Sequence, residues 1–209
     1  MTPAREAEGQ GKRSRPGRTG YNHPRPSLRF RPTYIPEVLI VEAEAYGDGR
    51  GFLMETYRQR EFAEAGIGFT FVQDNHPHSR GGALRGLHYQ VHHPQGKLIR
   101  VLAGEVFDVA VDLRRNSPTL GSWTGVCLSA QNRLQLWIPP GFAHGFYVTS
   151  QAADVVYNMT EYYGPEWERT IRWDDPDLGI RWPPRAEEPP LVSARDQAGL
   201  SFAQAEKVK

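Results

Sequence analysis

The chain has 209 residues, of which 39% are hydrophobic, so one domain with a sizeable core and tails is expected. Its net charge of +1 argues against a dedicated nucleic-acid binder, which usually carries a more basic balance. No apolar run approaches the ~20 residues that cross a bilayer, and the N-terminal region has no apolar signal-like core. We therefore expect a cytoplasmic protein with no membrane and no nucleic-acid partner.

The composition of residues 1–33 predicts a disordered basic leader. Cationic residues stand there among Gly, Pro and Ser without a hydrophobic pattern, namely Lys12, Arg13, Arg15, Arg18 and Arg25. Such a composition cannot bury enough apolar surface to fold. A nucleic-acid-binding arm is the weaker alternative for this segment. A single domain is expected over residues 34–209.

Strand-like patterns fill most of this domain, beginning with EVLIVEAEAY at 37–46, and a short helix is predicted at 58–65. Alternating apolar positions indicate further strands at 105–113, 133–138 and 154–159. In the strand at 105–113, one face carries Phe107, Val109, Val111 and Leu113, and the other carries Val106, Asp108, Ala110 and Asp112.

A proline-rich connector at 182–190 precedes a second predicted helix at 198–206, so the C-terminal piece is expected to fold back over the strands. The spacing of short strands between Gly, Pro and Asn turns is typical of an all-β sandwich or barrel. Two histidine-bearing segments with glycine turns, at 81–104 and 135–148, suggest the two halves of a jelly roll, or double-stranded β-helix.

Cys127 is the only cysteine, which excludes an intrachain disulfide and a cysteine-based zinc cluster. It lies in the strand-like run WTGVCLS. A buried strand thiol is therefore favoured over a nucleophile.

Jelly rolls with paired histidines can hold a metal, which requires three or four converging nitrogen or oxygen ligands. Here Lys97 occupies the place where a carboxylate ligand would be expected after His88, and its ammonium group would repel a divalent cation. His92 and His93 are adjacent and would point to opposite sides of a strand. We expect no metal.

Without a metal, the same segments fit proton transfer next to a carbonyl. His88 is a suitable base, and Lys97 could stabilise the oxygen of the resulting enolate. Tyr157, on a separate strand, is a suitable acid for the opposite face. Arg85 and His144 complete this polar set. One base, one oxyanion partner and one acid describe an epimerase or isomerase.

Each of these residues could instead be structural, since a strand histidine, a core tyrosine and an edge lysine are common. Arg85 and His88 also fall on opposite faces of a regular strand. A bulge at Gly86 would bring them to the same side.

From Ile35 to Asp196, about 160 residues, the chain resembles the dTDP-4-dehydrorhamnose 3,5-epimerase family, which has the cupin fold. The combination and order of the matching segments are specific, although no single segment is. They are GDGRGFLMETY at 47–57, FVQDNH at 71–76, LRGLHYQ at 84–90, QGKLIRVLAGEVFDVAVDLR at 95–114, SPTLGSW at 117–123, QLWIPPGFAHGF at 135–146 and WDDPDLGIRWP at 173–183.

The resemblance implies a role for each matching residue. His88 would be the base and Asp196 its carboxylate partner, with Tyr157 as the general acid and Lys97 beside the developing enolate. If the proline-rich connector shifts the register of the match with the family, Asp174 and Asp175 are the alternative candidates for this carboxylate. Tyr163 would stack on thymine, and the other substrate-binding residues would be Arg50, Phe52, Glu55, Gln73, Asn75, Arg85, His144, Glu168 and Arg195.

The resemblance therefore predicts conversion of dTDP-4-dehydro-6-deoxy-D-glucose to dTDP-4-dehydro-L-rhamnose, by proton removal and return at C3 and C5. No cofactor is expected, because the C4 ketone acidifies both neighbouring protons. A homodimer is expected, in which Arg50 or Glu55 completes the neighbouring site. The alternatives are an epimerase of a related dTDP-deoxysugar that inverts only C3 or only C5, a non-catalytic sugar-binding cupin, and a metal-dependent cupin oxygenase.

Overall fold

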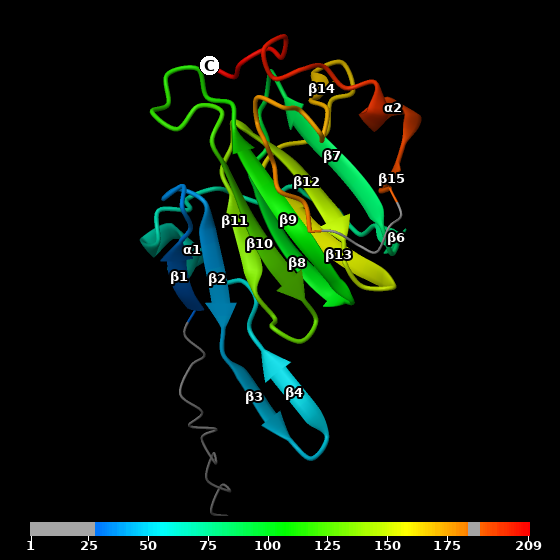
Figure 1. Cartoon of the computed structure of the whole chain (residues 1–209). Helices are drawn as coiled ribbons and strands as arrows, with labels where there is room; N and C mark the ends of the chain where they lie inside the picture. The colour runs from blue at the N-terminus through cyan, green and yellow to red at the C-terminus, as the bar shows by residue number, and fades with distance from the viewer. Residues whose placement is uncertain (1–27, 184–188) are drawn as a thin grey trace, which may run out of the picture.

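A computed structural model of the chain describes residues 28–183 and 189–209. The cationic cluster between Lys12 and Arg25, predicted to be disordered, lies outside these residues. Strands dominate the described part and form two large, mainly antiparallel sheets, with a separate hairpin that projects below them (Figure 1). The all-β prediction with short peripheral helices is confirmed. Within the described ranges no helix is long and apolar enough to span a membrane.

The first sheet contains seven strands, with β6 beside β13. In spatial order they are β1 (Leu28–Pro32), β2 (Leu39–Ala43), β11 (Gln135–Ile138), β8 (Lys97–Ala103), β13 (Ala152–Met159), β5 (Gln73–Asn75) and, off this path, β6 (His78–Arg80). The second sheet contains six strands, with β15 beside β7. They are β10 (Trp123–Ser129), β9 (Glu105–Asp112), β12 (Phe142–Val148), β7 (Ala83–Gln90), β14 (Glu168–Thr170) and β15 (Leu191–Val192).

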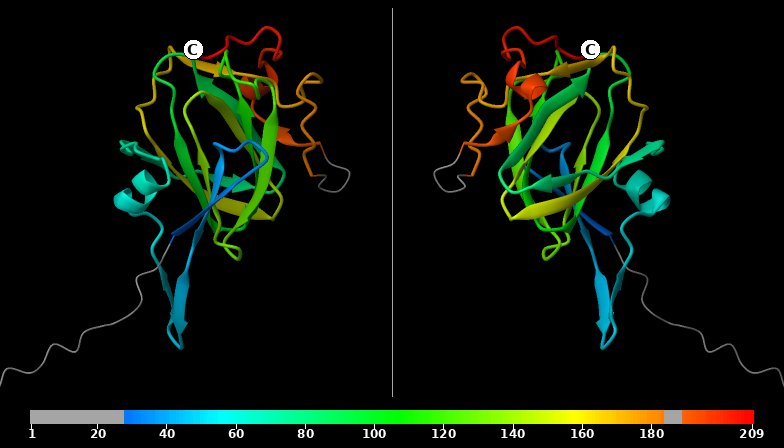
Figure 2. Two further views of the ribbon diagram at one scale, coloured as in Figure 1. Left: turned by 90° about the vertical axis from the view of Figure 1, so that its left-hand side faces the viewer. Right: turned by 90° about the vertical axis from the view of Figure 1, so that its right-hand side faces the viewer.

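The hairpin consists of β3 (Ala45–Asp48) and β4 (Gly51–Met54), and it extends away from the sheets in all three ribbon views (Figures 1 and 2). The helices are α1 (Gln59–Glu64) and α2 (Ala194–Gln197). α1 matches the helix predicted at 58–65. Its buried Phe62 packs edge-on against Phe30, with ring centroids 5.1 Å apart.

The main core lies between the two sheets, because its apolar side chains come from both. Ile99 and Val155 come from the first sheet, and Ala110 and Phe146 come from the second. β9 is buried on both faces, since Val109 and its same-face neighbours contact a second cluster beneath the C-terminal segment. Ala205 and Val208 of the C-terminal segment belong to this second cluster.

The predicted boundary between leader and domain at residues 33 and 34 falls too late. Leu28–Pro32 form β1, which pairs antiparallel with β2. Leu28 is buried, whereas Arg29 and Arg31 point away from the core, so the strand resembles the basic leader in composition.

The helix predicted at 198–206 is wrong. Gly199 lies so close to the backbone of Arg172 that a Cβ atom there would be 2.7 Å from its nitrogen. Leu200 forms a β-bridge with Ile171, and Phe202 packs against the cluster on the outer face of the second sheet. These tertiary contacts replace the helix with turns, and the helix that forms is α2, four residues long.

The buried position expected for Cys127 is also wrong, because this thiol is exposed. β10 is the edge strand of its sheet, and its inward-facing residue at this end is Leu128, which is fully buried. Strand alternation then turns Cys127 outward.

Asp112 is a buried acid at the end of β9 that accepts several side-chain hydrogen bonds. Its side chain is fully buried and accepts hydrogen bonds from Arg114 (Nε 3.0 Å, Nη2 2.7 Å), Ser117 (2.5 Å) and Thr119 (2.6 Å). Burial opposes its ionisation, but these hydrogen bonds outweigh burial and lower its pKa below 3.8. A depressed folded-state pKa stabilises the fold above the unfolded pKa and ceases to do so as pH falls through the folded value.

Asp112→Asn should therefore lower the free energy of unfolding at pH 7 by about 2 kcal/mol, because hydrogen bonds to a charged acceptor are lost. Urea denaturation at several pH values measures this difference, which should shrink below about pH 4. Asp174→Asn is the control, since Asp174 is exposed and pairs with Arg172, and the change should alter stability by less than about 1 kcal/mol. Equal losses in both variants would contradict the account.

Candidate active site

A cavity of about 270 Å³ lies between the two sheets at the end that carries β5, β7 and β14. Eight of the predicted site residues line it, together with residues that the sequence did not single out. The predicted ones are Gln73, Asn75, His88, Lys97, Tyr157, Tyr163, Glu168 and Arg195, and the others are Tyr89, Gln90, Gln95 and Met159.

His88 and Asp196 form a hydrogen-bonded pair at the wall of this cavity. His88 Nε2 lies 2.6 Å from Asp196 Oδ1, and Asp196 Oδ2 accepts a hydrogen bond from the Gly86 backbone nitrogen. Burial opposes ionisation of Asp196, but its bonds with His88, Gly86 and Ser193 lower its pKa overall. The carboxylate therefore stays ionised, and His88 Nδ1 is the ring nitrogen left to take up a proton.

Asp196 reaches His88 through the C-terminal segment. Ser193 is the N-cap of α2, and its hydroxyl accepts a hydrogen bond from the Asp196 backbone nitrogen. Asp174 and Asp175, the alternative partners, are engaged elsewhere. Asp174 pairs with Arg172, and Asp175 accepts backbone hydrogen bonds from Asp177, Leu178 and Phe202.

Lys97 and Tyr157 lie on the opposite sheet from His88. Lys97 begins β8, and Tyr157 lies on the adjacent strand β13, beside Ile99 of β8. The Lys97 side chain is buried, which lowers its pKa to about 8, while the charges of Asp108 and Glu168 act in the opposite direction. Lys97 is therefore a desolvated cation at neutral pH.

A second histidine–carboxylate pair lies behind the cavity. His144 Nε2 is 3.1 and 3.0 Å from the two carboxylate oxygens of Asp108, and both side chains are buried. Desolvation lowers the His144 pKa, as do the nearby Lys97 and His88, although Asp108 opposes this. A neutral His144 that donates to Asp108 is the arrangement that fits. The His144 ring lies 6.3 Å from the Tyr157 ring.

The expected bulge in β7 is present. The register between β7 and β12 shifts so that His144 faces His88 while Phe146 faces Arg85. Gly86 has a positive φ of 115°, and a Cβ there would be 2.6 Å from the Gly145 Cα. As a result, Arg85 and His88 reach one cavity, of about 330 Å³, which Ser193, Arg195 and Asp196 also line. His88 and Arg195 border both cavities.

Glu168 connects the aromatic and cationic groups at the rim. Its carboxylate accepts a 2.6 Å hydrogen bond from the Tyr163 hydroxyl, which raises the Tyr163 pKa, and it forms an ion pair with Arg195. The Tyr163 backbone nitrogen donates to Gln73 Oε1, and Gln73 in turn donates to Asn75.

Besides His144, three predicted binding residues lie outside these cavities. Arg50 pairs with Asp48 at the tip of the hairpin, and Glu55 pairs with Arg58 beside α1. Phe52 packs beneath the guanidinium of Arg133 at 4.1 Å. Figure 2 shows the hairpin reaching away from the barrel, so these residues do not serve the chain's own cavity in this arrangement.

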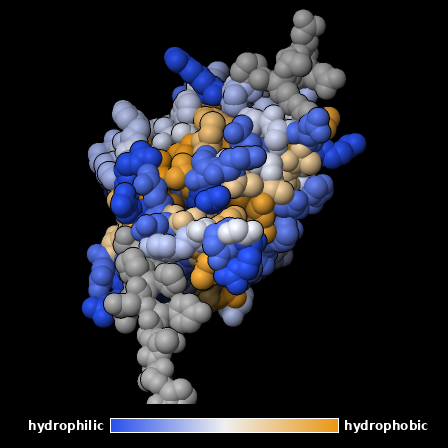
Figure 3. All heavy atoms as spheres, turned by 90° about the horizontal axis from the view of Figure 1, so that it is seen from below, coloured by the Kyte–Doolittle hydropathy of each residue, from blue (hydrophilic) through white to orange (hydrophobic). Residues whose placement is uncertain are grey.

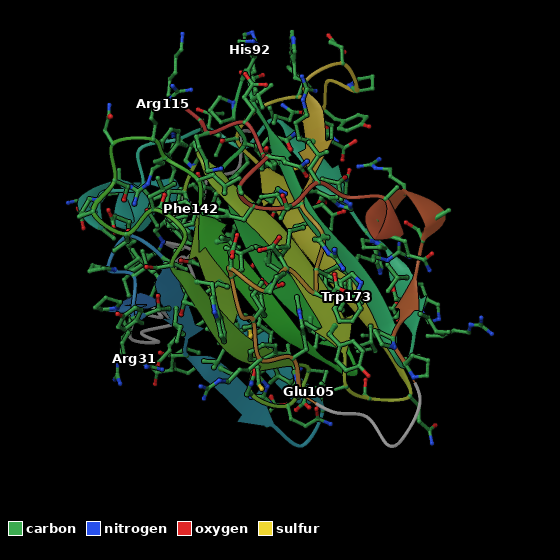
Figure 4. The ribbon with its side chains drawn as sticks, turned by 45° about the horizontal axis from the view of Figure 1, so that its top comes forward. Arg31, His92, Glu105, Arg115, Phe142 and Trp173 are labelled. Carbon is green, nitrogen blue, oxygen red and sulfur yellow. The ribbon has the colours of Figure 1, made fainter. Side chains whose placement is uncertain are left out.

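The structure also shows the position of His92 and residues near the cavity that the sequence analysis did not single out. Figure 4 places His92 at the upper rim with its side chain pointing outward, which agrees with its exposure. Among residues 28–183 and 189–209, no group of three or more His, Cys, Asp or Glu side chains could hold a metal ion. Sequence reasoning missed Asp108 and the glutamines Gln90 and Gln95. Asp108 had a signal, since it is an acid between Val106 and Ala110 on one strand face.

Comparison with known proteins gives the family. The model of the family described as dTDP-4-dehydrorhamnose 3,5-epimerase matches residues 32–204. The Neisseria gonorrhoeae protein of that name is 56% identical over 84% of this chain, although the match spans only 53% of that relative. The Pseudomonas aeruginosa protein of that name is 54% identical over 82% of this chain and 94% of its own length.

Solved structures agree with the fold. The dTDP-6-deoxy-D-glucose-3,5-epimerase of Legionella pneumophila, in complex with dTDP-4-keto-L-rhamnose, superposes with a TM-score of 0.83 at 49% identity, over 86% of this chain and 95% of that one. A 3′-monoepimerase of Streptomyces bikiniensis, in complex with dTDP-quinovose, has a TM-score of 0.76 at 33% identity, over 82% and 87%. The predicted cupin-type jelly roll is confirmed. The chain belongs to the dTDP-4-dehydrorhamnose 3,5-epimerase family of sugar-nucleotide isomerases.

Proposed function

We propose that the chain converts dTDP-4-dehydro-6-deoxy-D-glucose to dTDP-4-dehydro-L-rhamnose, with His88 as the base and Tyr157 as the acid. One observation carries the proposal: the two side chains come from opposite sheets and border the same cavity. A sugar ring held between them loses a proton on one face and gains one on the other, which inverts the carbon.

The first step is proton removal by His88 Nδ1 from a carbon next to the C4 ketone. The electron pair of the C–H bond moves toward the ketone oxygen and forms an enolate. His88 becomes an imidazolium, which the Asp196 carboxylate stabilises through its 2.6 Å hydrogen bond. The pair thus keeps the ring oriented while it accepts the proton.

Lys97 is the group best suited to stabilise the enolate oxygen. Its charge lies in a desolvated wall of the cavity, where an electrostatic interaction is stronger than in water. Tyr157 then donates its proton to the opposite face of the carbon. His88 releases its proton to solvent and Tyr157 regains one, so hydrogen from water enters the product.

The nucleotide provides binding energy remote from the reacting carbons. Arg85 and Arg195 line the second cavity and offer forked donors for a diphosphate. Tyr163 is exposed at the rim and offers a ring face for a thymine base. The bound dTDP-sugar in the Legionella relative supports this assignment.

A C3-only epimerase of a related dTDP-deoxysugar pathway is the second candidate, with a C5-only enzyme as its counterpart. The observation in favour of the C3-only enzyme is the structural likeness to the Streptomyces 3′-monoepimerase. Both chemistries use the same base and enolate. Greater identity to the double epimerases favours inversion at both carbons.

His88→Asn should lower the rate of hydrogen exchange with solvent at both C3 and C5 by at least about 10²-fold, because the base is lost. NMR in heavy water, with an added reductase to capture the product, measures deuterium at each carbon. dTDP binding should persist as the control. Deuterium at one carbon in the unaltered protein would support the single epimerase, and appreciable exchange in His88→Asn would remove His88 as the base.

Tyr157→Phe should leave proton removal largely intact but slow or misdirect proton return, because only the acid is lost. In the same experiment, deuterium should then enter with the original configuration retained. Unchanged rate and stereochemistry would show that another group is the acid.

The dependence of kcat/KM on pH should report the Lys97 pKa of about 8, with activity falling as pH rises through that value. Lys97→Arg should remove this alkaline limb, because the guanidinium stays charged, although the rate should fall since its shape differs. Lys97→Met should lose about 10²- to 10³-fold in kcat. If the fall in activity near pH 8 persists in Lys97→Arg, another group is responsible for it.

We further propose a homodimer in which the hairpin completes the neighbouring site. The support is that β4 exposes Phe52 and Leu53, which are 54% and 77% exposed, on an element that makes no contribution to its own cavities. Exposed apolar side chains are also visible on the face seen from below (Figure 3). An exposed apolar hairpin of this kind is typical of a self-association surface.

Co-expression of Arg50→Ala and His88→Asn chains tests this proposal. Each variant alone should be inactive, whereas random mixing gives mixed dimers with one intact site and about a quarter of the original activity. Activity of purified dimers, with mass measured by light scattering, is the readout. No recovery of activity, or a monomeric mass, would contradict a shared site.

The cytoplasmic location also remains a prediction, which cell fractionation tests.

A further inference from the structure

We propose that Gln90 and Gln95 are positioning residues that fix the loop carrying Tyr163, and so set nucleotide affinity without taking part in proton transfer. The proposal rests on the role proposed above for Tyr163, which is to contact the thymine base of the substrate. Neither glutamine has a role in the reaction described so far, and both border the cavity.

Gln90 connects three segments through one side-chain amide. Its Oε1 accepts a 2.7 Å hydrogen bond from the Gly164 nitrogen, and its Nε2 donates to the carbonyls of His93 at 2.8 Å and Tyr162 at 3.3 Å. The side chain is only 2% exposed. One amide at the end of β7 thus holds both the turn that follows this strand and the loop after β13.

Two further amides hold the same loop. Gln95 Nε2 donates to the Glu161 carbonyl at 3.0 Å, and Gln73 Oε1 accepts from the Tyr163 nitrogen at 2.9 Å. Four consecutive residues, 161 to 164, are therefore each bonded through their backbone to a glutamine side chain. The loop is fixed from the cavity wall.

Two constraints position the Tyr163 ring. Its hydroxyl donates a 2.6 Å hydrogen bond to Glu168, while the residue is 47% exposed and so has few packing neighbours. The position of the ring consequently depends on the backbone of the loop as well as on Glu168. A ring that is already in place binds a base without the entropic cost of ordering the loop during binding.

The same geometry separates Gln90 from the chemistry. Both hydrogens of its Nε2 are engaged by backbone carbonyls, so no donor is left for a substrate. Its loss should therefore act through Tyr163 and leave His88, Lys97 and Tyr157 able to move protons.

Gln90→Leu should raise KM, and the Kd for dTDP measured by titration calorimetry, by about tenfold, with kcat within about twofold. The sites of deuterium entry should not change. Ser150→Ala is the matched control, because the Ser150 hydroxyl also bonds to backbone groups, at Glu105 and Ala152, outside both cavities. A fall in kcat with unchanged KM would overturn the proposal. Should Gln90→Leu fail to fold, Gln95→Met is expected to show the same KM effect, smaller in size, and an unchanged KM there would equally overturn it.

A double-mutant cycle with Tyr163→Ala separates this inference from the function on which it rests. Once the ring is gone, Gln90→Leu should add little further loss of dTDP affinity, since both changes act on one contact. Fully additive losses would overturn positioning through Tyr163. A Tyr163→Ala variant with unchanged affinity would refute the proposed role of Tyr163 itself, whatever Gln90→Leu does.

Discussion

The site depends on keeping ionisable groups charged inside an apolar barrel. Burial alone would drive Lys97 toward its neutral form. The negative charges of Asp108 and Glu168 oppose this, so its pKa falls only to about 8. Roughly nine-tenths of the side chain therefore remains protonated at pH 7. His144, neutral through desolvation, satisfies Asp108 without adding a second cation beside Lys97. Lys97 thus stays a cation where an enolate would form.

A backbone constraint decides which residues meet at that point. Gly86 and Gly145 face each other on β7 and β12, and side chains at either position would collide with the opposing backbone. The bulge that this close contact accommodates breaks the two-residue alternation of β7. Arg85 and His88 consequently share a cavity, and the Gly86 nitrogen also reaches Asp196. The same irregularity therefore orients both Arg85 and the His88–Asp196 pair.

Local patterns predicted the strands and the bulge well, because alternation and glycine placement are properties of neighbouring residues. They failed where a distant contact decides the outcome. Residues 198–206 have helix-forming composition, but Leu200 and Phe202 are held by the second sheet. Cys127 lies on an edge strand, and edges follow from strand order, which alternation does not reveal. Gln90 was missed for the same reason, since its bonding partners lie up to 74 residues away.

The location of Asp196 couples stability to chemistry. The barrel strands supply His88, Lys97 and Tyr157, yet the carboxylate that orients His88 arrives on a C-terminal segment beyond the proline-rich connector. Only two residues of β15 pair with β7, and α2 spans four residues. The His88–Asp196 pair, the proposed base, is therefore complete only when this segment packs against β7. Its anchors are the Ser193 cap, the Leu200 bridge and the packing of Phe202, so these contacts keep the His88–Asp196 pair assembled.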